Sequence, residues 1–291
     1  MGVMVSGKQY RIVKLASGAH SVHSVAHAET FHPVVGPVAE AEALYVRQIR
    51  LPERLKRHTG EFVVWDVGLG AAANPITVLR AARELPCPIH LVSFDHTLEP
   101  LEFALQHTEH LPYLAGYEAP LEQLLRKQRV EFANGRQPVK WEMRLADFPA
   151  LLTQPAAQEF AKPHAILFDA FSPAKNPAMW TQPLFANLFR LLDPERPCAL
   201  PTYSRSTMLR VTLLLAGFFV GVGHPTGEKE ETTIAANTLD LLEEPLDRRW
   251  LERARRSTSA EPMWEAVYRQ APLASETWAK LKEHGQWKAR G

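Results

Sequence analysis

The chain has 291 residues, of which 46% are hydrophobic, so it is long and apolar enough for one large domain or two modest ones with a sizeable core. Its 33 Lys and Arg residues balance its 32 Asp and Glu residues, which excludes a strongly basic or acidic molecule and gives no reason to expect non-specific polyanion binding. The cysteines Cys87 and Cys198 sit beside prolines, and the longest apolar run, from Leu213, is shorter than the roughly 20 residues of a membrane span. We therefore expect a soluble cytoplasmic protein with free thiols, no secretory leader and no membrane contact.

Residues 1–60 precede the main pattern and are expected to form an N-terminal accessory segment. They predict one or two strands, including "QYRIVKL", and a helix from about Pro37 to Lys56.

Four histidines lie close together in this segment: His20, His23, His27 and His32. On a helix, their spacings would place the first three on one face, where imidazoles could bind a metal ion. No cysteine is near, and Ser, Val and Ala surround the histidines with little helix signal. We therefore expect no metal site.

From Glu61 onward, short apolar runs rich in β-forming residues alternate with segments of helical period. The expected strands are 62–68, 89–95, 139–145, 164–170 and 197–203. The expected helices are 75–85, 99–108, 120–129, 181–192 and 205–216. This alternation predicts an α/β fold with a parallel sheet covered by helices.

The pattern changes after residue 216. Two β-like runs, 217–223 and 231–237, have no helix between them, so they should pair as an antiparallel hairpin at the sheet edge. Five parallel strands finished by such a hairpin is the order of the class I methyltransferase (Rossmann-like) sheet, which we assign to residues 61–240. Residues 241–291 predict a helical C-terminal tail, with Trp-bearing helices around "DRRWLERARR" and "EPMWEAVYRQ".

The turn after the first strand of this sheet reads "WDVGLGAAANP", in which Asp66 precedes Gly68 and Gly70, and Asn74 follows. Glycines at a strand-to-helix turn let the backbone approach a ligand, and the helix N-terminus favours an anionic or polar group. Asp95 ends the next strand, where a carboxylate can accept hydrogen bonds from two vicinal ribose hydroxyls. Both S-adenosylmethionine and nicotinamide dinucleotides carry that ribose.

Two features favour S-adenosylmethionine. Ala73 stands where the dinucleotide fingerprint has its third glycine, so close approach of a pyrophosphate is less well provided for. Asp147 ends the third strand and an aromatic residue follows, which suits the amino group and the ring face of adenine. Each acid could instead be a turn former or a helix N-cap, but acids at successive strand ends favour a ligand site. The predicted cofactor site comprises Asp66, Gly68, Gly70, Asn74, Asp95, Asp147, Phe148 and Asp169.

The fourth expected strand ends on Asp169 and runs into "AFSPAKNPAMWT". Asp169 could take part in catalysis, or it could only cap the loop. Trp180 is expected to anchor the start of the next helix.

The block "FDAFSPAKNPAMWTQPLFANLFRLLDP" resembles the methyltransferase component of the bacterial tRNA 5-methylaminomethyl-2-thiouridine biosynthesis proteins, MnmC. "TYSRSTMLRVTLLLAGFFV", "GEKEETTIA" and "AETFHPVVGPVAEAEALYV" are similar to further elements of that family, so the resemblance covers roughly residues 10 to 240. It implies methyl transfer from S-adenosylmethionine to the 5-aminomethyl nitrogen of the tRNA wobble uridine, by a standalone methyltransferase without the flavin-dependent half. The chain departs from the family at Ala71, Ala72 and Ala73, which replace a threonine, a glycine and a leucine of the donor loop.

For this reaction we expect Asp169, Phe171, Pro173 and Lys175 to carry the chemistry. A primary amine in water is mostly an ammonium ion, and it must lose a proton before its lone pair can attack the methyl group. Asp169 would accept that proton or orient the amine, while Phe171 and Pro173 form a dry wall. Lys175 would hold a tRNA phosphate or the uracil carbonyl.

The resemblance also implies substrate contacts by Glu29, His32, Tyr203 and Lys229. For the phosphates of tRNA, the sequence offers three basic clusters, which are equally compatible with solvated helix faces: 47–58, 125–129 and 248–256.

Three other interpretations stay open. The chain could methylate a different amine or RNA position, or it could be a non-catalytic scaffold whose donor loop has degenerated. A nicotinamide oxidoreductase is a more distant alternative. The sequence does not predict the oligomeric state.

Overall fold

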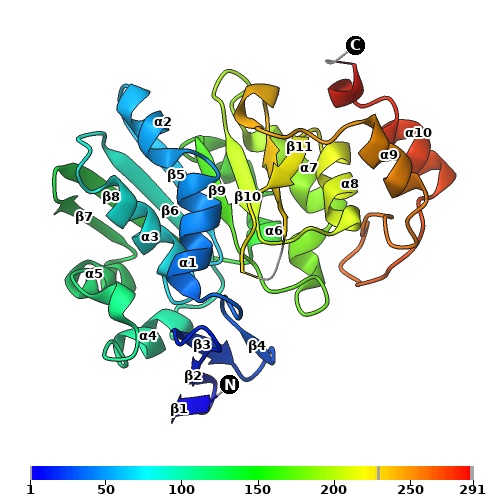
Figure 1. Ribbon diagram of the computed structural model, residues 1–291. Coiled ribbons are helices and arrows are strands. Elements are labelled where there is room, and N and C mark those ends of the chain that lie inside the picture. The colour runs from blue at the N-terminus through cyan, green and yellow to red at the C-terminus, as the bar shows by residue number, and fades with distance from the viewer. Residues whose placement is uncertain (1, 228–229, 289–291) are drawn as a thin grey trace.

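The computed structural model describes residues 2–227 and 230–288. Five parallel strands form its centre: β5 (Phe62–Val67), β6 (Ile89–Asp95), β8 (Gln137–Leu145), β9 (Ala165–Phe168) and β10 (Ala199–Thr202). Their order across the sheet is β10-β9-β5-β6-β8, and their carboxyl ends meet at one edge (Figure 1). Each strand overlaps an expected run, so the predicted parallel sheet is confirmed.

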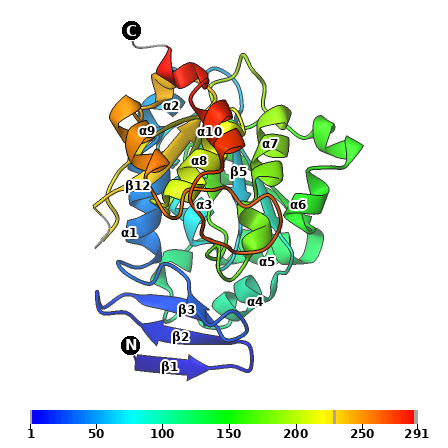
Figure 2. The same cartoon turned by 90° about the vertical axis from the view of Figure 1, so that its right-hand side faces the viewer.

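Helices cover both faces of this sheet (Figures 1 and 2). All five predicted helices are present, as α3 (Ala73–Ala82), α4 (Glu99–Leu105), α5 (Glu118–Lys127), α7 (Gln182–Leu191) and α8 (Thr207–Leu215). Alternate side chains of β5 point to opposite faces, with Phe62 and Val64 in the core on the α3 side and Val63 and Trp65 in the core on the α7 side. Burial on both faces explains why β5 is apolar at nearly every position.

An antiparallel hairpin closes one edge of the sheet, as predicted. β11 (Phe219–Gly223) pairs with β12 (Thr232–Ala236), and β12 pairs antiparallel with β10. The opposite edge carries a strand that the sequence analysis missed, β7 (Arg129–Asn134), which pairs antiparallel with β8. The predicted helix ran to residue 129, whereas Gln128 adopts a left-handed conformation (φ 55°) and ends α5. The Asn134-Gly135 pair at the end of β7 is a hairpin signal that could have revealed it.

The N-terminal segment forms a separate four-stranded antiparallel sheet at one end of the molecule (Figure 2). Its strands are β1 (Gly2–Ser6), β2 (Tyr10–Lys14), β3 (His20–Ser24) and β4 (Glu29–Thr30). The expectation of one or two strands was therefore too low. The expected helix is present in three pieces: α1 (Pro37–Ala41), a π-helical turn (Glu42–Arg47) and α2 (Leu51–Arg57).

The closely spaced histidines do not share a helix. His20 and His23 lie on β3, where residues three apart point to opposite faces. The spacing that would align them on a helix therefore separates them here.

The C-terminal tail contains α9 (Arg248–Arg255), as expected, and α10 (Ser275–Leu281). The prediction of a helix in "EPMWEAVYRQ" was wrong, because residues 264–270 are non-helical and exposed. Prolines at 262 and 272 flank this segment, and Trp264 is 44% exposed, so its apolar spacing does not create a buried face. Within the described ranges, no helix combines the length and the apolar character that crossing a membrane requires.

Candidate active site

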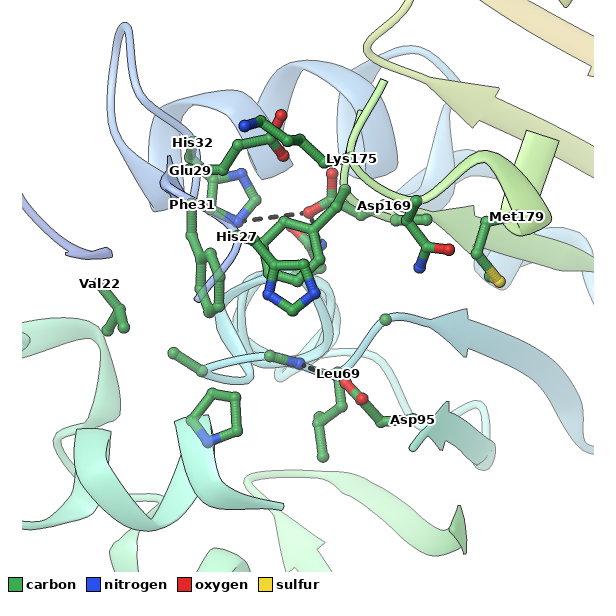
Figure 3. A pocket seen from close by; sticks show the side chains of 18 of the residues that line it. Val22, His27, Glu29, Phe31, His32, Leu69, Asp95, Asp169, Lys175 and Met179 are labelled. Carbon is green, nitrogen blue, oxygen red and sulfur yellow. Dashed lines mark hydrogen bonds and ion pairs between the residues drawn. The ribbon is translucent and has the colours of Figure 1, made fainter. Parts of the chain in front are cut away.

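A cavity of about 690 Å³ opens at the carboxyl ends of β5, β6 and β9 and is covered by the N-terminal sheet (Figure 3). Tyr10 and Val22 line it from the N-terminal sheet, whereas Asp95 and Asp169 line it from the central sheet. Open parallel sheets bind ligands at this edge because strand ends, loops and helix N-termini converge there. The cavity is therefore the candidate active site.

The loop between β5 and α3 forms one wall of the cavity in a conformation that requires glycine. Gly68 has φ 94°, and a Cβ placed on it would lie 2.7 Å from the carbonyl oxygen of Asp169. Gly70 has φ 51°, and its amide donates to Asp95 Oδ2 at 3.1 Å. The two glycines thus hold the loop tightly against the ends of β9 and β6.

The three alanines of this loop do not disrupt it. Ala71, Ala72 and Ala73 are each at most 5% exposed and pack into the core. The Tyr113 hydroxyl donates to the Ala71 carbonyl at 3.0 Å. Ala72, which stands in place of the family's glycine, adopts a left-handed conformation (φ 60°), so the loop keeps its conformation at a cost in backbone strain.

Acidic residues line the cavity where β6 and β8 end. Asp95 Oδ1 accepts from the His96 amide at 2.8 Å, so backbone donors fix both carboxylate oxygens of Asp95. Asp147 caps α6 (Phe148–Leu151) by accepting from the Ala150 amide at 2.8 Å, and Phe148 is 4% exposed beside it. Both carboxylates and the Phe148 ring thus occupy the cavity edge where a ribose and an adenine were predicted.

Asp66 requires a correction, because it does not line the cavity. Its side chain is fully buried within the sheet, and its Oδ2 accepts from the Ser93 hydroxyl at 2.7 Å. Burial raises the pKa of Asp66 to about 7 despite that hydrogen bond. The structure therefore places the Asp66 side chain inside the sheet, away from the cavity.

On the other side of the cavity, Asp169 follows the end of β9. Asn74, from the first turn of α3, donates from Nδ2 to Asp169 Oδ2 at 2.8 Å, and His32 Nε2 lies 3.5 Å from the same oxygen. Asn74, which was predicted to contact the cofactor, lines the cavity, and its side-chain nitrogen holds Asp169. Figure 3 shows His32 and Asp169 pointing toward one another, joined by a dashed line.

The loop after Asp169 faces the N-terminal sheet. The Phe171 ring stacks on His27 with ring centroids 4.1 Å apart and an interplanar angle of 16°. The Ser172 amide donates to Glu29 Oε2 at 3.1 Å, and its hydroxyl donates to Glu29 Oε1. Lys175 is exposed at the cavity mouth. This loop is therefore held by contacts to residues about 140 positions earlier in the chain.

Pro173 also requires a correction, because it does not line the cavity. Ser172 occupies the wall at this point, beside Phe171, which lines the cavity as predicted. The prediction for Trp180 is confirmed: it is fully buried just before α7, and its Nε1 donates to the Phe171 carbonyl at 2.7 Å.

Of the residues predicted to contact substrate, Glu29, His32 and Tyr203 line the cavity. The Tyr203 hydroxyl donates to the Ala170 carbonyl at 3.0 Å. Lys229 lies outside the described residues.

The sequence analysis did not single out four cavity residues for a role at the site: His27, Phe31, Glu40 and Ser172. Only part of this set lies in sequence blocks that resemble the related family. Ser172 lies within the "DAFSPAKNP" block, and Glu40 lies within "AETFHPVVGPVAEAEALYV". The contacts of the His27 and Phe31 rings with the Phe171 ring are what reveal a role for these two residues at the site.

A substitution of Asp95 tests the side of the cavity that is predicted to bind the methyl donor, which we call the donor side. We expect Asp95→Asn to weaken S-adenosylmethionine binding by about 10- to 100-fold, because an amide oxygen replaces a charged hydrogen-bond acceptor. Isothermal titration calorimetry measures this directly. Asp193→Asn changes a turn carboxylate that does not line the cavity and should leave the affinity unchanged. Equal affinities of Asp95→Asn and wild type would exclude Asp95 from the donor site.

Known proteins resemble the chain in sequence and in fold. Residues 115–238 match the family model of S-adenosyl-L-methionine-dependent methyltransferases. The tRNA 5-methylaminomethyl-2-thiouridine biosynthesis bifunctional protein MnmC of Aeromonas hydrophila is 32% identical over 209 residues, which cover 67% of this chain and 30% of that protein. MnmC of Pseudomonas putida is 30% identical over 233 residues, covering 74% of this chain and 33% of its own length. The chain thus spans about a third of the length of these curated relatives.

Two solved structures share the fold. MnmC2 from Aquifex aeolicus has a TM-score of 0.67 at 22% identity, over 96% of this chain and 83% of that one. A spermidine synthase in complex with the transition state analogue AdoDATO has a TM-score of 0.53 at 13% identity, over 96% of this chain and 88% of that one. By sequence, the chain is a relative of the MnmC proteins over about a third of their length, and it has the class I fold of S-adenosyl-L-methionine-dependent methyltransferases.

Proposed function

We propose that this protein transfers a methyl group from S-adenosylmethionine to the nitrogen of the 5-aminomethyl group on the wobble uridine of tRNA. The observation that carries the proposal is the pairing of two carboxylates across one cavity. Asp95 lies on the donor loop side, and Asp169 lies on the side of the "DAFSPAKNP" loop. A tRNA substrate also implies a location in the cytoplasm.

The residues of the donor side fit S-adenosylmethionine. The Gly68 position leaves no room for a Cβ, so the backbone itself forms the cavity wall there. Asp95 would accept hydrogen bonds from the ribose hydroxyls, and Asp147 and Phe148 would contact the adenine. When bound, S-adenosylmethionine supplies the transferable methyl group.

On the acceptor side, Asp169 would bind the substrate amine. Its carboxylate attracts the ammonium form and accepts a proton from it, which exposes the lone pair for attack. Phe171, stacked on His27 and packed against Phe31, provides an apolar wall that favours the neutral amine. The residues of this chain thereby bind, orient and deprotonate the nucleophile.

For tRNA, the mouth of the cavity offers Lys175 as an exposed cation. Of the three basic clusters, residues 47–58 offer fewer cations for binding tRNA phosphates than their composition suggests. Arg54 donates to the carbonyls of His164 and Pro197, at 2.8 and 3.1 Å, and therefore serves the fold. Lys175 is accordingly our candidate for a phosphate contact or a contact to the uracil carbonyl.

The proposal predicts a specific acceptor preference. With tritiated S-adenosylmethionine, we expect label in tRNA that carries 5-aminomethyl groups at the wobble uridine, and none in the same tRNA without them or in small amines. Transfer should decrease as salt rises, because phosphate contacts release counterions. Label in the small amines alone would indicate a different acceptor. No transfer, together with no S-adenosylmethionine binding near millimolar concentrations, would leave a scaffold.

A further inference from the structure

His32 lies between two carboxylates that come from different elements. Its Nε2 is 3.5 Å from Asp169 Oδ2, after the end of β9, and its Nδ1 is 3.4 Å from Glu40 Oε1, on α1. The three side chains are 7%, 16% and 6% exposed for His32, Asp169 and Glu40 respectively. Water therefore screens these charges poorly.

Only the imidazolium form of His32 satisfies both carboxylates, because a neutral ring has a proton on one nitrogen alone. Burial disfavours that cation, but the charges of Asp169 and Glu40 outweigh burial and raise the pKa of His32 to about 9. The ring is therefore protonated at neutral pH and loses its proton as the pH rises through about 9.

The other titratable groups near this pair do not compete for the role. Tyr45, from the π-helical turn, and Tyr203 both have pKa values well above the ordinary value for tyrosine, first because of burial and then because of Asp169 and other acids. Both phenols are therefore neutral. Glu29 is engaged by Ser172 on the loop after Asp169. His32 is thus the cationic group that faces Asp169 within the described part of the chain.

The backbone at His32 supports a specific role. His32 has φ 48°, a left-handed conformation that is uncommon outside glycine and costs about 1 kcal/mol or more. Pro33 follows it, and a proline restricts the residue before it as well.

We propose that Glu40 and His32 form a buried positioning pair that keeps the Asp169 carboxylate ionised and fixed toward the substrate amine. Without the cation, Asp169 would lie in a buried cavity close to other acids, conditions that favour its protonated form. A protonated Asp169 cannot accept the ammonium proton. The inference rests on the proposed amine methylation, and it assigns His32 and Glu40 to positioning rather than to direct contact with the reacting atoms.

A metal ion is the competing interpretation of the same cluster. His32, Glu40 and Asp169 each offer one atom, and these atoms lie within 4.8 Å of one another. However, the two ring nitrogens face different carboxylates, so the arrangement is a chain of charges with the imidazolium at its centre. Treatment with EDTA is accordingly expected to leave activity unchanged, and a loss that a divalent ion restores would overturn the proposal.

Two variants test the pair. Glu40→Gln keeps the shape of the side chain but removes one charge, and His32→Asn removes the ring while retaining a residue type that tolerates the left-handed conformation. His107→Asn is the matched control, because His107 pairs with Glu109 and does not line the cavity.

The first readout is the protonation state of the His32 ring, measured by nitrogen NMR of the protein without ligands. The ring signal that is missing in His32→Asn belongs to His32. We expect the wild-type ring to titrate near pH 9, and Glu40→Gln to lower that titration by about 1 to 3 units. A wild-type ring that titrates near its ordinary value, or one that ignores Glu40→Gln, would overturn the proposal. This readout needs no methyl acceptor, so it remains decisive even if the proposed function fails.

The second readout is the pH profile of methyl transfer to aminomethyl tRNA under saturating S-adenosylmethionine. We expect the alkaline limb of the Glu40→Gln profile to shift to lower pH, by as much as the titration of His32 shifts in that variant. His32→Asn should lower kcat by roughly 10- to 100-fold, because the Asp169 carboxylate would no longer be held in place. The affinity for S-adenosylmethionine should not change. His107→Asn should match wild type. Superimposable profiles would exclude a positioning role, and a downward shift of the acidic limb in Glu40→Gln would show that His32 itself accepts the proton.

Discussion

Asp169→Asn is expected to lower kcat for methyl transfer by about 10²- to 10⁴-fold, the usual contribution of a positioned base. The amide keeps the size of the side chain and can still accept from Asn74. It carries no charge for the ammonium group or for His32, and it cannot take up the proton. Affinity for S-adenosylmethionine should change little, because the donor side is held by Asp95 and the glycine loop. Single-turnover kinetics with saturating tRNA, together with calorimetry, separate the two effects.

The control for this prediction is Asp247→Asn. Asp247 caps α9 by accepting from the Trp250 amide at 2.8 Å, and asparagine caps helices about as well as aspartate. Asp247→Asn should therefore retain full activity. If Asp169→Asn behaved like Asp247→Asn, Asp169 would also be a capping residue, and the proposed base would have to be another group.

Gly68→Ala is expected to remove most of the activity and to lower the free energy of unfolding by about 1 to 3 kcal/mol. The residue has φ 94°, and the added Cβ would lie 2.7 Å from the Asp169 carbonyl oxygen. That contact is to backbone, so relief requires the end of β9 to move, and Asp169 moves with it. A displacement of about 1 Å at a reacting group can cost about 100-fold in rate.

Gly60→Ala separates backbone strain from the close contact. Gly60 also has a positive φ, 86°, but a Cβ there would meet nothing within 4 Å. Urea unfolding should show a lower free energy of unfolding in both variants, because both residues have a positive φ. The rate of methyl transfer should fall only in Gly68→Ala. Equal activity of the two variants would mean that the contact between Gly68 and Asp169 does not position the carboxylate.

The arrangement of Asp95, Asp147 and Asp169 on one edge could be predicted from the sequence. Each follows an apolar run, and the carboxyl ends of parallel strands meet at the same edge of the sheet. The same argument was wrong for Asp66, which lies one position before the end of β5. Its side chain lies beside Ser93 on β6, whereas Asp95 lies two residues further along β6, closer to the edge of the sheet where the cavity opens.

The contribution of the N-terminal sheet could not be derived from local patterns. The contacts of Glu29 with Ser172 and of His27 with Phe171 join residues about 140 positions apart, so no spacing in the sequence reveals them. The resemblance to the MnmC family indicated that Glu29 and His32 lie near the substrate. It did not indicate that His32 would join Asp169 to Glu40, because that chain of charges brings residues of the N-terminal segment to the end of β9.

The most direct test of the proposed function is nucleoside analysis of the tRNA after reaction. Aminomethyl tRNA is incubated with the protein and S-adenosylmethionine, digested to nucleosides and examined by mass spectrometry. We expect the 5-aminomethyl nucleoside to be converted to its 5-methylaminomethyl form, and Asp169→Asn to prevent this conversion. A methyl group on any other nucleoside, or an unchanged 5-aminomethyl nucleoside in the presence of bound S-adenosylmethionine, would contradict it.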